Sequence, residues 1–294
     1  MLIESHAHYS HKKFENKYPY LSYDRLTGEY TVEQANRPAL FQALRQQDIG
    51  GTIEPAIDIA SNQRVLELAS AHPGWIFPAI GLHPTRTPNE KWADRKILEE
   101  LSKRPEVVAI GETGMDFHYP RREQHRLCQL RWFVFQIMLA HRRRLPLILH
   151  IRMADSAAIA VLRLFKPLLH GGVAHCFNSD LKTAQALMKL GFHLGIGGTL
   201  LQDGKAGQTL RETVKHVPLD RMLLETDAPY VHPTCDAVPN AKKRASVRNT
   251  SMILPAVARG IAELKGMDVA EVERQTTENA VLLFRLPIKQ IEST

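Results

Sequence analysis

Short apolar runs alternate along the whole chain with segments whose apolar residues recur at helical spacing. Such runs predict buried parallel strands, and the segments between them predict helices. We expect strands at residues 2–8, 50–54, 75–80, 107–111, 146–150, 172–175, 192–196 and 221–224, and helices at 33–47, 62–71, 92–101, 121–144, from 155 onward, 180–190, 203–214, 251–265 and 269–283. Asp155 or Ser156 is the expected N-cap of the helix that starts there. No linker divides these elements, so the pattern predicts a single-domain α/β fold, a TIM (β/α)8 barrel over residues 1–294.

Residues 11–38 interrupt this alternation, because they are polar and rich in Tyr and Lys. Asp24 and Gly28 are typical turn residues within the stretch. Since it leaves the end of the first strand, we expect an extended loop beside the mouth of the barrel, and another loop at 233–248.

Imidazole and carboxylate side chains follow five of the expected strands. The carboxyl ends of parallel barrel strands meet at one rim, so these side chains are expected to meet there. A hydrogen-bonding role at a loop start would explain any one of them, but it does not explain the whole set. The candidate metal ligands are His6, His8, Glu112, His150, His175 and Asp227.

A pair of divalent cations would suit this ligand set. Two such ions lie about 3.5 to 4 Å apart and need a bridging carboxylate between them. Glu112 is the expected bridge, between one ion held by His6, His8 and Asp227 and another held by His150 and His175. A water between the ions loses its proton near neutral pH, and Asp227 is the expected general base.

Composition adds little to this interpretation. Hydrophobic residues make up 44% and charged residues 23%, as in ordinary folded proteins. The net charge of +7 favours an anionic partner, although a merely basic surface would give the same value. The three cysteines show no spacing typical of disulfide frameworks or zinc sites, so we expect a cytoplasmic location. Neither a signal peptide nor a membrane-spanning run is expected.

Several motifs resemble the TatD family of metal-dependent deoxyribonucleases, which are TIM barrels of the amidohydrolase superfamily. The matching stretches are residues 4–8, 79–84, 109–116, 149–152 with Asp155, 174–177, 223–230 and 276–279, together with Gln129, Phe133 and Gln136. They span nearly the whole chain.

The resemblance implies hydrolysis of phosphodiester bonds, mostly in DNA and typically from the 3′ end. Mg²⁺ or Mn²⁺ would be in use, with Zn²⁺ possible. It implies that the six candidate ligands bind metal. His83, which as a lone residue fits a structural role equally well, and Arg152 match positions that line the pocket, where they would contact phosphate.

Three features depart from the family pattern. The stretch between residues 11 and 38 is about twenty residues longer than in a typical member, so it is a family-atypical insertion expected over the mouth. Thr250 and Ser251 stand where the family usually has Glu-Pro, so the loop from Pro233 is expected to be held differently. Tyr9 replaces a leucine, which is expected to change packing only.

These observations leave three hypotheses. The first is a deoxyribonuclease that binds single-stranded DNA, attracted partly by the basic residues of 242–248. The second keeps the metal site but acts on an amide, on an ester such as aminoacyl-tRNA, or on a small phosphoester. The third is an accessory subunit that docks a protein partner through residues 11–38.

Overall fold

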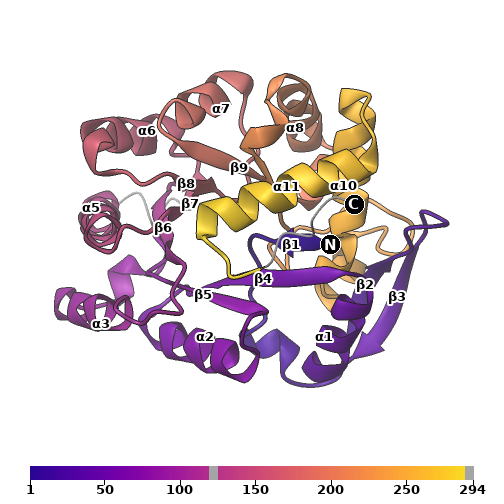
Figure 1. Ribbon diagram of the computed structural model, residues 1–294, viewed down its shortest axis with the longest axis horizontal. Coiled ribbons are helices and arrows are strands. Elements are labelled where there is room, and N and C mark those ends of the chain that lie inside the picture. Colours follow the sequence, from indigo (N-terminus) through magenta and orange to yellow (C-terminus); the bar gives the residue numbers. More distant parts are fainter. Residues whose placement is uncertain (119–124, 289–294) are drawn as a thin grey trace.

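The computed structural model describes residues 1–118 and 125–288. Its centre is a barrel of parallel strands that follow one another in chain order (Figure 1). The barrel closes where the amide of Ser5 donates to the carbonyl oxygen of Leu224, at 2.9 Å. Its strands are β1 (Leu2–Glu4), β4 (Ile49–Pro55), β5 (Ile76–Ile80), β6 (Ala109–Asp116), β7 (Leu147–Arg152), β8 (Gly172–Ala174), β9 (Phe192–Ile196) and β10 (Met222–Leu224). The predicted single-domain TIM barrel is confirmed.

Helices surround this barrel (Figure 1). They are α1 (Arg37–Gln46), α2 (Ile59–Ala71), α3 (Arg95–Leu101), α5 (Arg126–Arg143), α6 (Asp155–Leu164), α7 (Leu181–Met188), α8 (Lys205–His216), α9 (Ala241–Ser246), α10 (Leu254–Lys265) and α11 (Val269–Phe284). Several begin at a side chain that accepts a hydrogen bond from the first turn, such as Asn36 before α1 and Asp180 before α7. Before α2, Asp58 and Ser61 form a reciprocal capping box.

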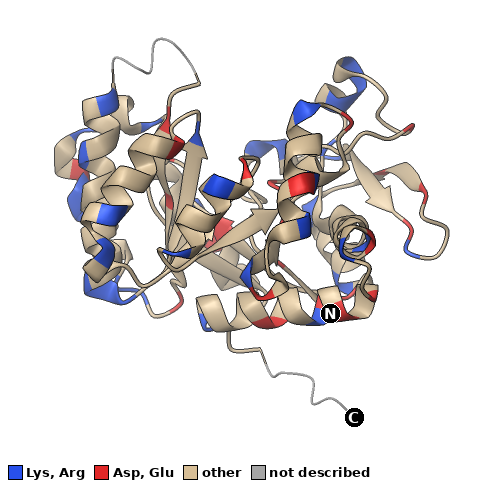
Figure 2. Cartoon of the chain, turned by 90° about the horizontal axis from the view of Figure 1, so that it is seen from above, with Lys and Arg blue, Asp and Glu red and all other residues tan. Residues whose placement is uncertain are grey.

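The barrel is closed at its amino-terminal end by α11, which lies across β1 and β10 (Figures 1 and 2). Ala280 and Phe284 of this helix pack in one buried cluster with strand residues such as Ile3, Ile148 and Leu223. Burial of such side chains stabilises by about 1.5 to 3 kcal/mol each. The opposite, carboxyl-terminal end stays open for a site.

The strand boundaries differ most from the predicted ones at the ends of β1, β6 and β7. β6 and β7 run on together to the pair Asp116 and Arg152, past the predicted ends at 111 and 150. β1 ends at Glu4, whereas 2–8 was expected. His6 and His8 therefore lie just beyond the strand, where the carbonyl oxygen of His6 accepts from the Asp227 amide (2.9 Å) and the His8 amide donates to Ala228 (2.8 Å).

The expectation of an extended loop at 11–38 was wrong. This segment contains a short 3-10 turn, η1 (Lys12–Phe14), and an antiparallel hairpin of β2 (Tyr18–Tyr23) and β3 (Tyr30–Ala35). The hairpin lies on the flank of the barrel, near α1 (Figure 1). The amide of Leu21 in β2 donates to the carbonyl oxygen of Arg248, and the amide of Arg248 donates to the carbonyl oxygen of Pro19, both at 2.8 Å. Because residues 33–35 belong to β3, the following helix starts at Arg37 and not at 33.

Other helices also begin at residues that differ from the predicted ones. The helix expected from 121 is α5, and residues 121–124 lie outside the described part of the chain. Asp155 is the first residue of α6 and not its cap; its side chain accepts from the Ser179 hydroxyl at 2.8 Å. The loop expected at 233–248 contains the short helix α9.

Candidate metal centre

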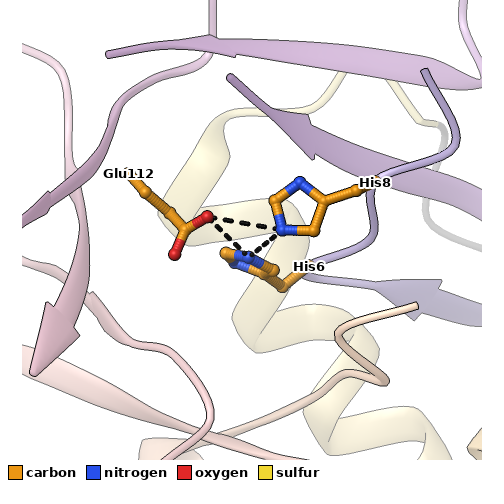
Figure 3. Close-up of side chains that lie close together, drawn as sticks. All are labelled: His6, His8 and Glu112. Atoms are coloured by element: carbon orange, nitrogen blue, oxygen red, sulfur yellow. Dashed lines mark hydrogen bonds and ion pairs between the residues drawn. The ribbon is translucent and has the colours of Figure 1, made fainter. Parts of the chain in front are cut away.

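The six predicted ligands meet around one buried carboxylate. Oε2 of Glu112 lies 3.4 Å from Nε2 of His6 and 3.3 Å from Nε2 of His8 (Figure 3). Oδ1 of Asp227 lies on the same side, 3.4 Å from Nε2 of His8 and 3.9 Å from that of His6. These four side chains form the first donor group.

The other oxygen of Glu112 faces a different pair of histidines. Oε1 lies 2.9 Å from Nε2 of His175 and 3.3 Å from Nδ1 of His150, and these two nitrogens are 3.1 Å apart. The carboxylate thus connects the first donor group to a second one.

The spacing of these donors fits a shared cation. Ligand atoms about 2.1 Å from one ion, at octahedral or tetrahedral angles, are themselves about 3.0 to 3.4 Å apart. Most of the separations between these nitrogen and oxygen atoms lie near this range. In addition, Glu112 is buried, and its Oε2 receives no hydrogen bond of normal geometry from the described residues. A cation bound there would compensate for the cost of burying this negative charge.

Hydrogen bonds to neighbouring residues determine which ring nitrogen of a histidine is free to bind a cation. Nδ1 of His8 faces the carbonyl oxygen of Pro55 at 3.2 Å, so its proton belongs there and Nε2 keeps a lone pair for the centre. Nε2 of His150 similarly donates to Oδ2 of Asp116 at 3.2 Å, which leaves Nδ1 free to bind. In its neutral form, each ring therefore has the tautomer that a metal ligand requires.

His83 has the opposite arrangement. The amide of Thr85 donates to its Nδ1 at 3.1 Å, so the proton of the neutral ring is on Nε2, 3.6 Å from Oε1 of Glu112. Burial and the neighbouring His150 hold the pKa of His83 well below its usual range, so the ring stays neutral. It presents an N–H donor to the centre, which suits contact with a substrate oxygen better than metal binding.

The charges of the centre favour cation binding. Burial acts to raise the pKa of Glu112, but the surrounding histidines, led by His175, hold it well below its usual range, so the side chain is a carboxylate. Burial lowers the pKa of His6 to about 4, which keeps this ring neutral and able to donate a lone pair. For His8, burial acts to lower the pKa, but Asp227 and Glu112 raise it well above its usual range. A cation would have to displace that proton, so binding would weaken in acid.

Asp116 is a buried residue of this centre that the sequence reasoning missed. Besides the bond from His150, it accepts a 2.9 Å hydrogen bond from the amide of His118. The signal was present, because residues four apart in a strand point to the same side, and β6 carries Glu112 and Asp116 at that spacing. It was overlooked because the strand was expected to end at 111.

Another buried carboxyl group, that of Glu4, joins the ends of β1 and β10 behind the centre. It accepts hydrogen bonds from the amides of His6 (3.0 Å) and Thr226 (2.9 Å) and from the hydroxyl of Ser251 (2.8 Å). The Tyr9 hydroxyl lies 2.7 Å from that of Ser251 and accepts from the Ser251 amide at 2.9 Å. The expectation that Tyr9 changes packing only was therefore wrong. Its hydroxyl is hydrogen-bonded to Ser251, which also departs from the family pattern.

Two cavities open onto the centre. The larger, about 560 Å³, includes Arg152, Asn178 and Gln202 in its wall, and the smaller, about 190 Å³, includes His11 and Arg86. Their walls have in common His83, Thr85, His150, His175, Asp227 and Tyr230. The substrate contacts expected from the sequence, His83 and Arg152, thus lie beside the candidate ligands. Of the 11–38 segment, His11 lines the smaller of these two cavities, and the hairpin lines neither of them.

Among the described residues, the structure contains no helix with the length and hydropathy needed to cross a bilayer.

Comparison with known proteins connects this geometry to a family. The family model of TatD related DNases matches residues 3–285. A protein of Erwinia billingiae named 3′-5′ ssDNA/RNA exonuclease TatD is 34% identical over 252 residues, which cover 86% of this chain and 94% of that protein. YabD of Bacillus subtilis, named an uncharacterized metal-dependent hydrolase, is 31% identical over 286 residues, 97% of this chain and 100% of YabD.

A solved structure agrees with these sequence matches. The TatD homologue YJJV of Escherichia coli superposes with a TM-score of 0.76 at 25% identity, over 97% of this chain and 98% of that one. The barrel, the acid and imidazole residues at its open end and the sequence matches lead to one conclusion: the chain belongs to the family of TatD related DNases and is a metal-dependent hydrolase.

Proposed function

We propose that the chain is an exonuclease that removes nucleotides from the 3′ end of single-stranded nucleic acid and that it works with two divalent cations, Mg²⁺ or Mn²⁺. The observation that carries this proposal is the position of Glu112, whose two oxygens face separate donor groups. His6, His8 and Asp227 would complete one cation site, and His150 and His175 the other. The names of relatives such as the Erwinia protein supply the substrate class and the polarity.

Cations bound in this way would lower the pKa of water and neutralise charge on the phosphate. The remaining tasks belong to side chains. Asp227 is the proposed general base, because its carboxylate is 17% exposed and lines both cavities, whereas Glu112 is 2% exposed. Although burial acts to raise its pKa, the bond to His8 and the nearby histidines lower the pKa of Asp227, so it is ionised and ready to accept a proton.

Two further side chains are proposed to orient the substrate. The Nε2–H of His83 would donate to a phosphate oxygen beside Glu112, and Arg152 would bind phosphate from the wall of the larger cavity. Asp116 is proposed to hold His150 in position through its 3.2 Å bond.

A cleavage assay tests the proposal. A single-stranded DNA 12-mer labelled at its 5′ end should give a ladder of products shortened from the 3′ end when Mg²⁺ or Mn²⁺ is added, and none with EDTA. An RNA 12-mer in parallel would establish which sugar is preferred.

Asp227→Asn should slow this reaction by about a hundredfold or more, since general bases contribute roughly that much. Asp220→Asn removes an exposed carboxylate from the turn before β10 and should cleave like the unaltered protein. Absence of metal-dependent cleavage of either strand, or full activity in Asp227→Asn, would refute the proposal.

A further inference from the structure

Four cations lie around the smaller cavity without acidic partners. Lys12 and Lys13 belong to η1, Arg86 follows β5, and Arg248 follows α9. We call these four residues the basic rim. In the described part of the chain, none of them forms an ion pair with a carboxylate, in contrast to cations elsewhere on the surface such as Lys103 and Arg274.

The rim is held in place by specific contacts. The ammonium of Lys13 lies 4.3 Å from the centre of the Tyr230 ring, a cation–π contact. The guanidinium Nε of Arg248 is 3.4 Å from the carbonyl oxygen of Lys13. Phe14, the last residue of η1, is buried against Tyr9 and Tyr18, with ring centres 5.0 and 5.1 Å away. This anchoring fixes the turn that carries both lysines.

The rim adjoins the candidate metal centre. His11, the residue before η1, lines the smaller cavity together with Arg86, Tyr230 and Asp227. Because Nδ1 of His11 accepts from the Lys13 amide at 3.1 Å, the proton of its neutral ring is on Nε2. The mouth therefore carries the N–H donor of His11 next to several positive charges.

Like charges held together repel one another, and a polyanion relieves that repulsion. In Figure 2, Lys and Arg residues are spread over the outer helices on several sides, so net charge alone does not locate a partner. The rim differs from those surfaces because its cations come from three separate segments and lie beside the cavity that holds Asp227.

We propose that the basic rim and the N–H of His11 bind the phosphate backbone of the nucleic-acid strand next to the bond that is cut. This inference rests on the proposed exonuclease function and extends it by assigning a role to the start of the 11–38 segment. An exposed aromatic ring beside a positively charged groove is a common arrangement for single strands, and Tyr230 is 41% exposed here. DNA and RNA share the phosphate backbone, so both are expected to bind.

Binding of a phosphorothioate (dT)12, which resists cleavage, tests the inference by fluorescence anisotropy in Mg²⁺. The paired change Lys12→Gln/Lys13→Gln should weaken binding about tenfold near 0.15 M salt. It should also reduce the slope of log Kd against log salt by about 1.4, which is two phosphate contacts to a single strand. Lys13→Arg should bind (dT)12 as tightly as the unaltered protein does, because it keeps the positive charge at this position.

The matched control is Lys166→Gln/Lys189→Gln, which removes two exposed lysines after α6 and α7, at the opposite end of the barrel. It should bind as the unaltered protein does. The melting temperature of each variant shows whether it is folded. A parallel (rU)12 arm compares the two sugars.

The two proposals fail in different ways. If the unaltered protein cleaves neither DNA nor RNA but binds (dT)12 through Lys12 and Lys13, the exonuclease proposal falls and the rim remains a nucleic-acid site. If it cleaves DNA but the rim and control variants bind (dT)12 equally well, the rim inference is wrong. Failure of the unaltered protein to bind either oligonucleotide would also overturn the inference.

Discussion

Glu112 is the residue on which the candidate centre depends. Its oxygens lie within 3.4 Å of four different imidazole nitrogens, two on each side. Asp116, Pro55 and Thr85 then decide which rings offer a lone pair and which offers a proton. The same side-chain type can thus be a candidate ligand at position 150 and a candidate hydrogen-bond donor at position 83.

Glu112→Gln keeps the size of the side chain but removes its charge. We expect the variant to bind at most one divalent cation per chain, where the unaltered protein binds two, and to hydrolyse DNA about a thousandfold more slowly. Titration calorimetry with Mn²⁺ and the cleavage assay measure these quantities. Glu67→Gln, on the exposed side of α2, is the control and should match the unaltered protein. Two bound ions in Glu112→Gln would refute the bridging role.

His232 should make the stability of the fold sensitive to pH. Burial lowers its pKa from 6.5 to about 4, and its Nε2 lies 3.0 Å from the carbonyl oxygen of Val247. Between these two pKa values the unfolded chain binds a proton that the folded chain does not, so stability falls as pH falls. For this one group the loss is about 2 kcal/mol between pH 7 and pH 5.

His232→Gln keeps a donor for Val247 but does not titrate. Urea unfolding at pH 7 and pH 5 should therefore show a loss of stability about 2 kcal/mol smaller in the variant. An equal loss in both proteins would show that His232 does not stay neutral when buried.

Most of the candidate centre could be predicted at the residue scale. His150, His175 and Asp227 each follow an apolar run, and parallel strands bring the ends of such runs together. Asp116 could not be found in this way, because its place depends on how far β6 stays paired with β7. The tautomers likewise depend on neighbours that are distant in the sequence, such as Pro55 for His8.

At the scale of elements, apolar strands could be predicted and the hairpin could not. The barrel strands are buried on both faces and read as continuous apolar runs. β3 alternates exposed and half-buried residues, and β2 is largely aromatic, so neither resembles the other strands. The two strands are ordered by hydrogen bonds to each other and to Arg248, and the local sequence does not predict these contacts.

The close contact of β6 with β7 gives a prediction at this scale. Gly114 has φ +136°, and a Cβ there would lie 2.2 Å from the carbonyl oxygen of His150. Gly114→Ala combines an unfavourable backbone angle with a clash against main chain, so it should destabilise the barrel by about 3 kcal/mol or more.

Gly74 provides the matched control for this substitution. It also has a positive φ, +74°, but a Cβ there would meet nothing within 4 Å. Gly74→Ala should therefore cost only about 1 to 2 kcal/mol. Urea denaturation of both variants shows how much stability the clash costs beyond the unfavourable backbone angle. Equal losses of stability in the two variants would contradict the packing between β6 and β7.

For the whole molecule, the candidate centre joins strands from all around the barrel. Candidate ligands come from the segments of β1, β6, β7, β8 and β10, so cations bound to them would stabilise the folded chain against separation of these strands. α11 closes the other end, so the open rim and the closed base are distinct parts of one barrel (Figure 1).

Mn²⁺ should therefore raise the melting temperature. A ligand present at a hundred times its Kd stabilises the folded state by about 2.7 kcal/mol, which corresponds to roughly 4 to 5 °C in a chain of this size, since the unfolding entropy is about 2.1 cal/mol/K per residue. Scanning calorimetry with and without Mn²⁺ measures the shift. Asp227→Asn, with one ligand weakened, should show a smaller shift, and an identical shift in both proteins would place the stabilising ion elsewhere.

Anomalous scattering from a crystal grown with Mn²⁺ tests the central claim most directly, because it locates the cations without reference to activity. We expect two peaks on opposite sides of the Glu112 carboxylate, one within bonding distance of His6, His8 and Asp227 and the other within bonding distance of His150 and His175. A map with no peak at Glu112, or with a single peak that leaves one of these two groups of side chains without an ion, would contradict the account.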